Sequence, residues 1–174
     1  MSRQVWTIGH STHSFQNFLE ILNSFHIELV ADIRNYPGSK RFPHFNLESL
    51  KNSLPENKID YCHFKALGGR RKPGPNSKNL GWRVEAFRGY ADYMETGEFK
   101  TAIAELENIA LIKRVAYMCS EAVWWRCHRA LVSDYLKFHG WSAFHIMDIG
   151  KSMEHPYTRP AKIIGNELAY PKLP

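Results

Sequence analysis

The stretch IELVADI, which runs from Ile27 to Ile33, decides the fold. It is a short apolar run that only Glu28 and Asp32 interrupt. Strands buried on both faces of a parallel sheet have such near-continuous apolar sequences, whereas a strand with one solvated face alternates apolar and polar residues. The stretch therefore predicts a strand in a parallel sheet that is covered on both faces.

Four other short segments have strand character, and helical patterns separate them. The predicted strands are Gln4–Ile8, Ile59–Phe64, Arg114–Met118 and Trp141–Met147. The predicted helices are Phe15–His26 after an N-cap at Ser14, a short helix from an Asn46 cap through Leu54, Val84–Met94, Glu98–Ala110, and a long helix Val123–His139 ended by Gly140. Alternating strands and helices predict an α/β fold: a mostly parallel five-stranded sheet with helices on both faces, in a single domain.

The length and composition indicate one folded unit. A chain of 174 residues with 44% hydrophobic residues is long enough and apolar enough to form a core. Residues 1–150 are expected to form the α/β domain. Residues 151–174, which include Pro156, Pro160 and Pro171, are expected to form an extended strap that belongs to the same domain.

The sequence favours a cytoplasmic protein with no membrane partner. No stretch approaches the roughly 20 apolar residues that cross a bilayer, and MSRQVWTIGHSTHS at the start lacks the apolar run of a signal peptide. The three cysteines, Cys62, Cys119 and Cys127, make a disulfide framework unexpected and suit a reducing compartment.

The positive charge is concentrated in residues 65–88, here called the basic segment. The formal net charge of the chain is +6. The segment supplies all of that excess through Lys65, Arg70, Arg71, Lys72, Lys78, Arg83 and Arg88 against the one acid Glu85. Trp82, Phe87, Tyr90 and Tyr93 lie in or beside it and could stack on bases or simply pack as a helix face. The segment predicts contact with an anionic partner, such as a nucleotide, DNA or RNA.

Polar side chains follow every predicted strand. Ligands of open parallel sheets bind beyond the carboxyl ends of the strands, where loops converge and helix N-termini point. The residues at these ends are Gly9-His10-Ser11, Asp32 with Arg34, His63 with Gly68-Gly69-Arg70, Cys119-Ser120-Glu121, and His145 with Asp148. We therefore expect a ligand site at this edge of the sheet.

The segment CSEAVWWRCHR, from Cys119 to Arg129, is the strongest local pattern. A thiol at a strand end that faces a helix N-terminus can have a lowered pKa and become a nucleophile. Cysteine-dependent phosphatases and rhodaneses place an arginine six positions after the cysteine, but Arg126 is seven positions after Cys119. That chemistry is therefore not assigned, and Cys119 could equally be a small buried residue.

Cys127 has the helical spacing of a packing residue. Its predicted helix face includes Trp124, Leu131, Tyr135 and Phe138, which favours a core position. On such a helix, Cys127 and its neighbour His128 would diverge by about 100°, so a tetrahedral zinc site with Cys119 is not expected. No other metal or cofactor is predicted.

Three further residues have alternative interpretations. Glu121 could cap the following helix or act as a general base beside Cys119 and His10. Asp32 could simply pair with Arg34, yet a buried carboxylate at a strand end favours a functional role. His10 follows Gly9, which lets the backbone approach a ligand closely.

Several motifs resemble the domain of unknown function 488 family. They are TIGHS at 7–11, DIRNYPGSKRFPHFN at 32–46, LGGRR at 67–71, NLGWRVEAFRGYADYM at 79–94 and CSEAVWWRCHR at 119–129, followed by His145-Ile146. They run in the family's order over nearly the whole chain, with a departure at Trp124, where proline is frequent. The resemblance implies an α/β domain, mostly bacterial and archaeal, with no settled reaction.

Two functional hypotheses are favoured, and a metal protein is a third that elemental analysis would test. In the first, the protein is an enzyme that acts on a phosphate-bearing substrate, a nucleotide or nucleic acid. Its catalytic residues would be Cys119, Glu121, His10 and Asp32, and its substrate-binding residues Ser11, Arg34, Gly68, Gly69, Arg70, Arg71, Arg126, His128, Arg129 and His145. In the second, the basic segment makes the chain a nucleic-acid-binding module without turnover.

Overall fold

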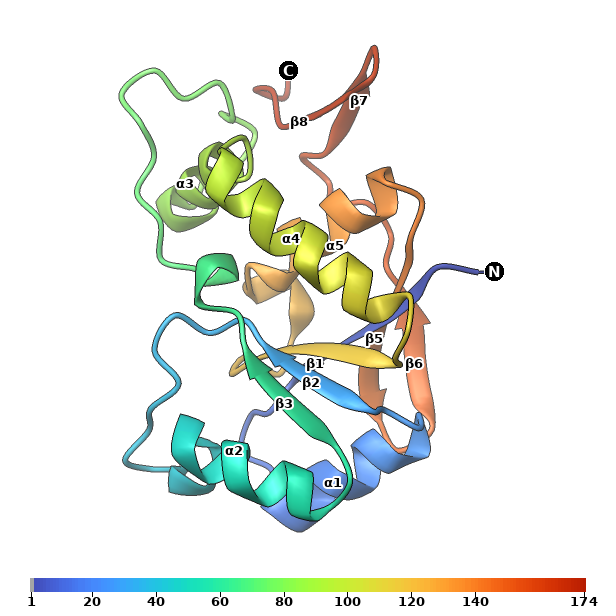
Figure 1. Cartoon of the computed structure of the whole chain (residues 1–174). Coiled ribbons are helices and arrows are strands. Elements are labelled where there is room, and N and C mark those ends of the chain that lie inside the picture. The colour runs from blue at the N-terminus through green and yellow to red at the C-terminus, as the bar shows by residue number, and fades with distance from the viewer. Residues whose placement is uncertain (1) are drawn as a thin grey trace.

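The main sheet contains six strands in the order β3-β2-β4-β1-β5-β6 in a computed structural model that describes residues 2–174 (Figure 1). The strands are β1 (Gln4–Gly9), β2 (Leu29–Asp32), β3 (Asp60–His63), β4 (Val115–Cys119), β5 (Ser142–Asp148) and β6 (Lys151–Glu154). Strands β1 to β5 pair in parallel, and β6 runs antiparallel to β5. The predicted mostly parallel α/β fold is confirmed, with β6 in addition. Met1, the first residue of the predicted domain, lies outside the described residues.

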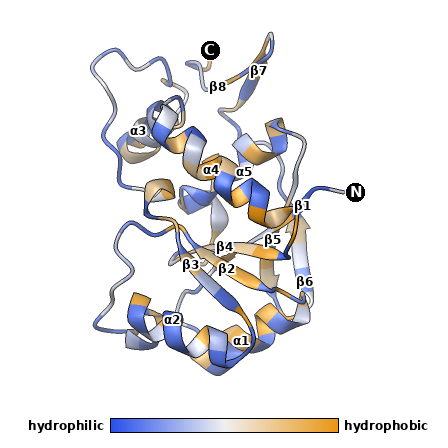
Figure 2. Ribbon diagram, viewed as in Figure 1, coloured by the Kyte–Doolittle hydropathy of each residue, from blue (hydrophilic) through white to orange (hydrophobic). Residues whose placement is uncertain are grey.

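Helices cover both faces of the sheet. Helices α1 (Phe15–Ser24) and α2 (Leu47–Glu56) lie on one face, and α3 (Glu85–Tyr93), α4 (Gly97–Ala110) and α5 (Arg129–Phe138) lie on the other (Figure 1). Successive side chains of β2 enter two different cores: Leu29 and Ala31 pack on the side of α3–α5, and Val30 packs on the side of α1 and α2. Two-sided burial explains the apolar strands, which are largely orange in Figure 2.

The predicted long helix Val123–His139 is wrong in its first third. Trp124–Arg126 form a short 3-10 turn, Cys127 is extended with φ −132° and ψ 152°, and α5 begins only at Arg129. The helical spacing of Trp124, Cys127 and Leu131 is therefore not the spacing of one helix face. The extended conformation at Cys127 turns its sulfur toward Cys119, so a tertiary contact overrides the local periodicity.

The C-terminal residues have more regular structure than a strap. Besides β6, they form a hairpin of β7 (Lys162–Ile164) and β8 (Glu167–Ala169). Tyr170 is buried after the hairpin, where its carbonyl accepts a hydrogen bond from the backbone N–H of Gly81 at 2.8 Å. The end of the chain thus packs against the basic segment. In the described part of the chain, no helix has the length and apolar character to span a bilayer.

The two predicted caps differ in outcome. Ser14 caps α1 by accepting a hydrogen bond from the backbone N–H of Asn17 at 3.1 Å, as expected. Asn46 occupies the N-cap position of α2, but its side chain accepts from the backbone N–H of Ser39 at 2.5 Å and leaves the helix uncapped. Asn46 therefore fixes the preceding loop, which forms one wall of the pocket described next.

Candidate active site

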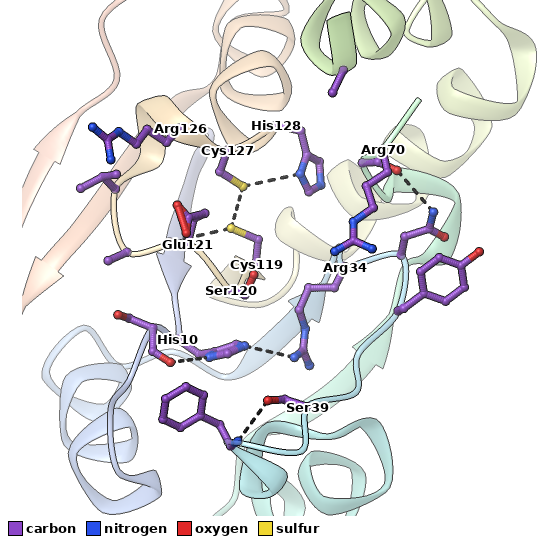
Figure 3. A pocket seen from close by; sticks show the side chains of 18 of the residues that line it. His10, Arg34, Ser39, Arg70, Cys119, Ser120, Glu121, Arg126, Cys127 and His128 are labelled. Carbon is purple, nitrogen blue, oxygen red and sulfur yellow. Dashed lines mark hydrogen bonds between the residues drawn. The ribbon is translucent and has the colours of Figure 1, made fainter. Parts of the chain in front are cut away.

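A pocket of about 710 Å³ lies beyond the carboxyl ends of β1, β2 and β4 (Figure 3). Its lining includes many of the predicted site residues: His10, Ser11, Arg34, Gly69, Arg70, Cys119, Glu121, Arg126 and His128. Thr12, Tyr36, Phe42, Phe87, Ser120 and Cys127 also contribute. Strand-end residues of β1, β2 and β4 therefore converge on one cavity, beside the first part of the basic segment, whereas His63, His145 and Asp148 do not line it.

Backbone contacts between β1 and β4 shape this cavity. The N–H of His10 donates to the carbonyl of Cys119 at 2.9 Å, and the N–H of Ser11 donates to that of Ser120 at 3.0 Å, so the pairing continues past both strand ends. A Cβ atom on Gly9 would lie 1.6 Å from the carbonyl oxygen of Glu121. Only glycine therefore lets the loop after Cys119 cross so close to β1.

The two thiols of the CSEAVWWRCHR segment meet at the base of the pocket. The Sγ atoms of Cys119 and Cys127 lie 2.6 Å apart and are hydrogen-bonded, and both cysteines are free. The guanidinium of Arg129 donates from Nε to Cys119 Sγ at 3.0 Å, and its backbone N–H donates to Cys127 Sγ at 3.5 Å. Cys127, predicted as a core residue, is thus part of the site.

The surroundings of the two thiols shift their pKa values in opposite directions. Burial raises the pKa of Cys127, but the hydrogen bond with Cys119 and the positive charge of Arg129 outweigh it and lower that pKa to about 7. Burial and the interaction with Cys127 raise the pKa of Cys119 well above the ordinary value. The two thiols therefore hold one proton between them near neutral pH, with Cys127 as the thiolate.

His128 packs beside Cys127 with a fixed ring orientation. Its Nε2 is 3.0 Å from the carbonyl oxygen of Ile33, which must accept, so Nε2 carries the hydrogen. Nδ1 is then an acceptor, and it lies 3.5 Å from Cys127 Sγ. Burial lowers the pKa of His128, which keeps the ring neutral. A Cβ on Gly69 would lie 2.9 Å from Nδ1, so this glycine provides the space for the ring.

Arg129 is buried beneath the pocket and does not line it. It is only 1% exposed. Besides Cys119, its guanidinium donates to Thr7 Oγ1 at 2.8 Å and to the carbonyl of Glu121 at 2.6 Å. Within residues 2–174, no carboxylate forms an ion pair with it. The predicted substrate contact of Arg129 is therefore replaced by a contact with the thiols, whose thiolate form it stabilises.

The opening of the pocket carries unused hydrogen-bond donors. Arg70 is exposed, has a φ of 61°, and directs its guanidinium into the pocket (Figure 3). The backbone N–H groups of residues 120–123 donate to no acceptor among the described residues. Ser11, with a φ of 47°, also lines the cavity. Strained backbone and free donors at one place are typical of an anion-binding site.

His10, Asp32 and Arg34 form a closed cluster on the opposite wall. Asp32 accepts from Arg34 Nε at 2.8 Å, from Arg34 Nη2 at 2.6 Å and from the hydroxyl of Tyr61 at 2.6 Å. His10 accepts from Arg34 Nη1 through Nε2 at 3.1 Å and donates from Nδ1 to the carbonyl of Ser11 at 2.9 Å. Burial, with a smaller effect of Arg34, lowers the pKa of His10 to about 4. These groups fix the wall and leave no free base.

Other predicted residues lie away from the reactive atoms. Arg71 packs 3.7 Å above the ring of Tyr93, and Gly68 lies against Asn35. The guanidinium of Arg126 points away from the sulfurs (Figure 3). His145 is buried outside the pocket. Glu121 is exposed and caps neither the 3-10 turn nor α5, so the capping interpretation is wrong.

The aromatic residues near the basic segment belong mainly to the core. Tyr90 and Tyr93 are buried and donate their hydroxyls to the carbonyls of Leu67 and Ala66 at 2.7 and 2.6 Å. They are unavailable for stacking on a base, whereas Phe87 lines the pocket. Among residues 2–174, no group of three His, Cys, Asp or Glu side chains could hold a metal ion.

The comparisons with known proteins identify a family and give no activity. Searches of curated proteins and of solved structures found no match. The profile of the family described as Domain of unknown function DUF488 matches residues 14–136, which include α1 to α4 and both pocket thiols. The chain therefore belongs to the DUF488 family.

Proposed function

We propose that this protein is a thiol-dependent enzyme that acts on a phosphate-bearing substrate, with Cys127 as its nucleophile. The observation that carries the proposal is the pair of thiols, 2.6 Å apart, between a buried arginine and an open pocket. A purely structural pair of cysteines needs neither a guanidinium without a carboxylate nor access to a cavity. An activated thiolate needs both.

The reaction would begin with the Cys127 thiolate. Its sulfur forms a bond to the electrophilic atom of the substrate, the bond from that atom to the leaving group breaks, and the leaving group departs with the electron pair. The proton that Cys119 holds is available to the leaving group. Water or another acceptor then displaces the sulfur, and the proton of that acceptor returns to Cys119.

The anionic part of the substrate would bind at the opening of the pocket. Arg70 offers a free guanidinium, and the N–H groups of residues 120–123 offer a row of neutral donors. An arginine fork and consecutive backbone N–H groups both match phosphate oxygens. Lys72, Lys78 and Arg83 are exposed on the same basic segment, which favours a nucleotide or nucleic acid over a small inorganic ester.

Site-resolved alkylation tests the nucleophile. Iodoacetamide is allowed to react over a range of pH, and each cysteine is followed by peptide mass spectrometry. We expect the Cys127 rate to reach half its maximum near pH 7. Cys62 is an internal control, because the residue as a whole is exposed and reagent can reach it. Partial burial of its sulfur and the negative charge of Glu105 raise the pKa of its thiol. A Cys127 that reacts only at the pH where Cys62 reacts would overturn the assignment.

Matched arginine variants test the anion site. Inorganic phosphate, AMP and a short oligonucleotide are the probes, and calorimetry gives their affinities. Arg70→Ala should weaken binding about tenfold or more, since a charge-assisted hydrogen bond contributes about 1.5–3 kcal/mol. Arg83→Ala removes the same charge from the same segment outside the pocket and should change AMP affinity less than about twofold. Equal losses in the two variants would exclude the pocket as the binding site.

A nucleic-acid-binding module without turnover is the second candidate. The exposed Lys72, Lys78 and Arg83 form no ion pair within the described chain, which favours it. This function predicts that oligonucleotide affinity falls steeply with salt and is lost in an Arg70/Arg71/Lys72 triple alanine variant, while Cys127→Ser binds normally. Binding that is insensitive to salt would contradict it.

A further inference from the structure

A continuous chain of buried hydrogen bonds connects Arg129, the first residue of α5, to the carboxylate of Asp134 in the same helix. Arg129 Nη1 contacts Thr7 Oγ1 at 2.8 Å, and Thr7 Oγ1 lies 3.1 Å from His145 Nδ1. His145 Nε2 lies 2.8 Å from His155 Nδ1, and His155 Nε2 lies 2.8 Å from Asp134 Oδ1. All five residues are buried.

The two ends of the chain determine where its hydrogens lie. A guanidinium only donates and a carboxylate only accepts. If every link is one hydrogen bond, Arg129 donates to the Thr7 hydroxyl, which in turn donates to His145 Nδ1. His145 then donates from Nε2 to His155 Nδ1, and His155 donates from Nε2 to Asp134. Both histidines are then neutral and carry their hydrogen on Nε2. Every bond is polarised in the same direction, from the positive end to the negative end.

The opposite arrangement leaves a buried group without a partner. If His155 were protonated on both nitrogens, His145 would donate from Nδ1 to Thr7 Oγ1. Thr7 would then receive two donors, and its own hydrogen would have no acceptor, because His145 and Arg129 are the side-chain partners of Thr7. A buried hydroxyl without an acceptor is costly. Burial and the proximity of His155 also lower the pKa of His145 to about 2.

Packing holds the chain rigid. The ring of Trp124 stacks on His145 with centroids 4.3 Å apart and an interplanar angle of 5°. Asp134 also accepts from the backbone N–H and hydroxyl of Thr158 at 2.9 and 2.5 Å and from the hydroxyl of Tyr170 at 3.0 Å. Asp134 therefore has a single orientation, and each link transmits that orientation toward Arg129.

We propose that Thr7, His145, His155 and Asp134 are positioning residues that hold the Arg129 guanidinium against Cys119. The proposal rests on the proposed function, since it assigns these four residues to the thiol site. It explains why a buried arginine beside two thiols has no carboxylate neighbour. The compensating negative charge is three groups away, so Arg129 is oriented without being neutralised, and its charge is left to the thiolate.

Thr7→Val and Thr7→Ser test the chain with little change of volume. Valine removes the hydroxyl, whereas serine keeps it. We expect the Cys127 alkylation profile of Thr7→Val to shift upward by about one pH unit, which is about fivefold slower reaction at pH 7. Thr7→Ser should remain within about twofold of the wild type. Thermal unfolding of both variants shows that they are folded, and a stability loss without a shift in the alkylation profile would mean a merely structural role.

Asp134→Asn and an NMR measurement keep the proposal falsifiable. Asparagine removes the negative charge of Asp134, the acceptor that fixes the direction of the hydrogen bonds, so the Cys127 alkylation profile should again shift to higher pH. The proposal would be overturned if Thr7→Val and Asp134→Asn were both folded and had the wild-type alkylation profile. In the wild type, ¹⁵N NMR should find the hydrogen of His145 on Nε2, and a hydrogen on Nδ1 would overturn it without any variant. None of these readouts uses a substrate, so failure to bind phosphate would count against the proposed function alone.

Discussion

Two arginines are buried on opposite sides of the same pocket, and their surroundings differ. Arg34 forms a bidentate pair with Asp32 at 2.6 and 2.8 Å. Arg129 contacts two sulfur atoms, a hydroxyl and a carbonyl, and no carboxylate. The charge of Arg34 is therefore neutralised where it lies, and that wall is a rigid support. The charge of Arg129 is left for an anion that can form and disappear, which is what a reactive thiol requires.

The largest expected effect comes from breaking the neutralised pair. Arg34→Met leaves Asp32 as a buried carboxylate without its guanidinium and should lower the free energy of unfolding by about 3–5 kcal/mol. Urea unfolding measures this. Lys113→Met is the matched control, because Lys113 pairs with Asp60 at the surface, where solvent screens the pair, and its loss should lower the stability far less. Similar losses in both variants would show that burial of the Asp32–Arg34 pair does not matter.

Arg129→Met should destabilise the protein less than Arg34→Met. It leaves no carboxylate unpaired, because the two thiols can take up a proton and become neutral. We expect a loss of about 1–3 kcal/mol, because the Thr7 oxygen and the Glu121 carbonyl each lose the hydrogen bond that Arg129 donates. The pKa of Cys127 should rise, so that alkylation at pH 7 slows. If Arg129→Met left the pH dependence of Cys127 alkylation unchanged, Arg129 would not stabilise the thiolate, and its lack of a carboxylate partner would not matter for the thiol.

The thiol pair should make stability depend on pH. In the folded protein the pKa of Cys127 is lowered to about 7, so between pH 7 and 8 the unfolded chain binds more protons than the folded one. The stabilisation is therefore present above the unfolded thiol pKa and is lost as pH falls through 7. Relative to Cys127→Ala, the free energy of unfolding should rise by about 1 kcal/mol from pH 7 to 8. A constant difference across this range would contradict the lowered pKa.

The smallest effect is expected at Glu121. Its side chain is exposed and caps no helix, so Glu121→Gln should change the free energy of unfolding by less than about 0.5 kcal/mol. Loss of a real N-cap costs about 1 kcal/mol. Ser14→Ala, which removes the true cap of α1, is the comparison in the same urea experiment. A larger loss for Glu121→Gln than for Ser14→Ala would reassign the role of the glutamate.

The sheet could be predicted from sequence because its central strands β2 and β4 are buried on both faces. IELVADI and its counterparts have the continuous apolar character that two-sided burial requires, and helices α1, α3 and α4 have clear periodicity. β6 was not predictable in the same way, because all four of its residues are exposed and its sequence has no apolar pattern. An edge strand that pairs through its backbone alone leaves little trace in the side chains.

The sequence brought together residues that do share a cavity. The strand-end rule grouped Cys119, Arg70 and Gly69, and all three line the same pocket. It missed Cys127, because Trp124, Cys127 and Leu131 have the spacing of one helix face although they do not belong to one helix. The extended conformation at Cys127 separates the 3-10 turn from α5, and it accompanies the contact with Cys119. The buried chain to Asp134 depends on pairs that lie 10 to 138 residues apart in the sequence. One signal was available, since Asp134 lies on the apolar side of its helix and needed a partner.

The hydrogen bonds of Asp134 have a practical consequence for shortening the protein. All four come from residues beyond 150: one from His155, two from Thr158 and one from Tyr170. A chain cut after β5 would retain every parallel strand, yet it would contain a buried carboxylate with no donor. Truncation or fusion at the apparent end of the α/β unit would thus damage the interior, and residues 155–170 belong in any minimal version of this protein.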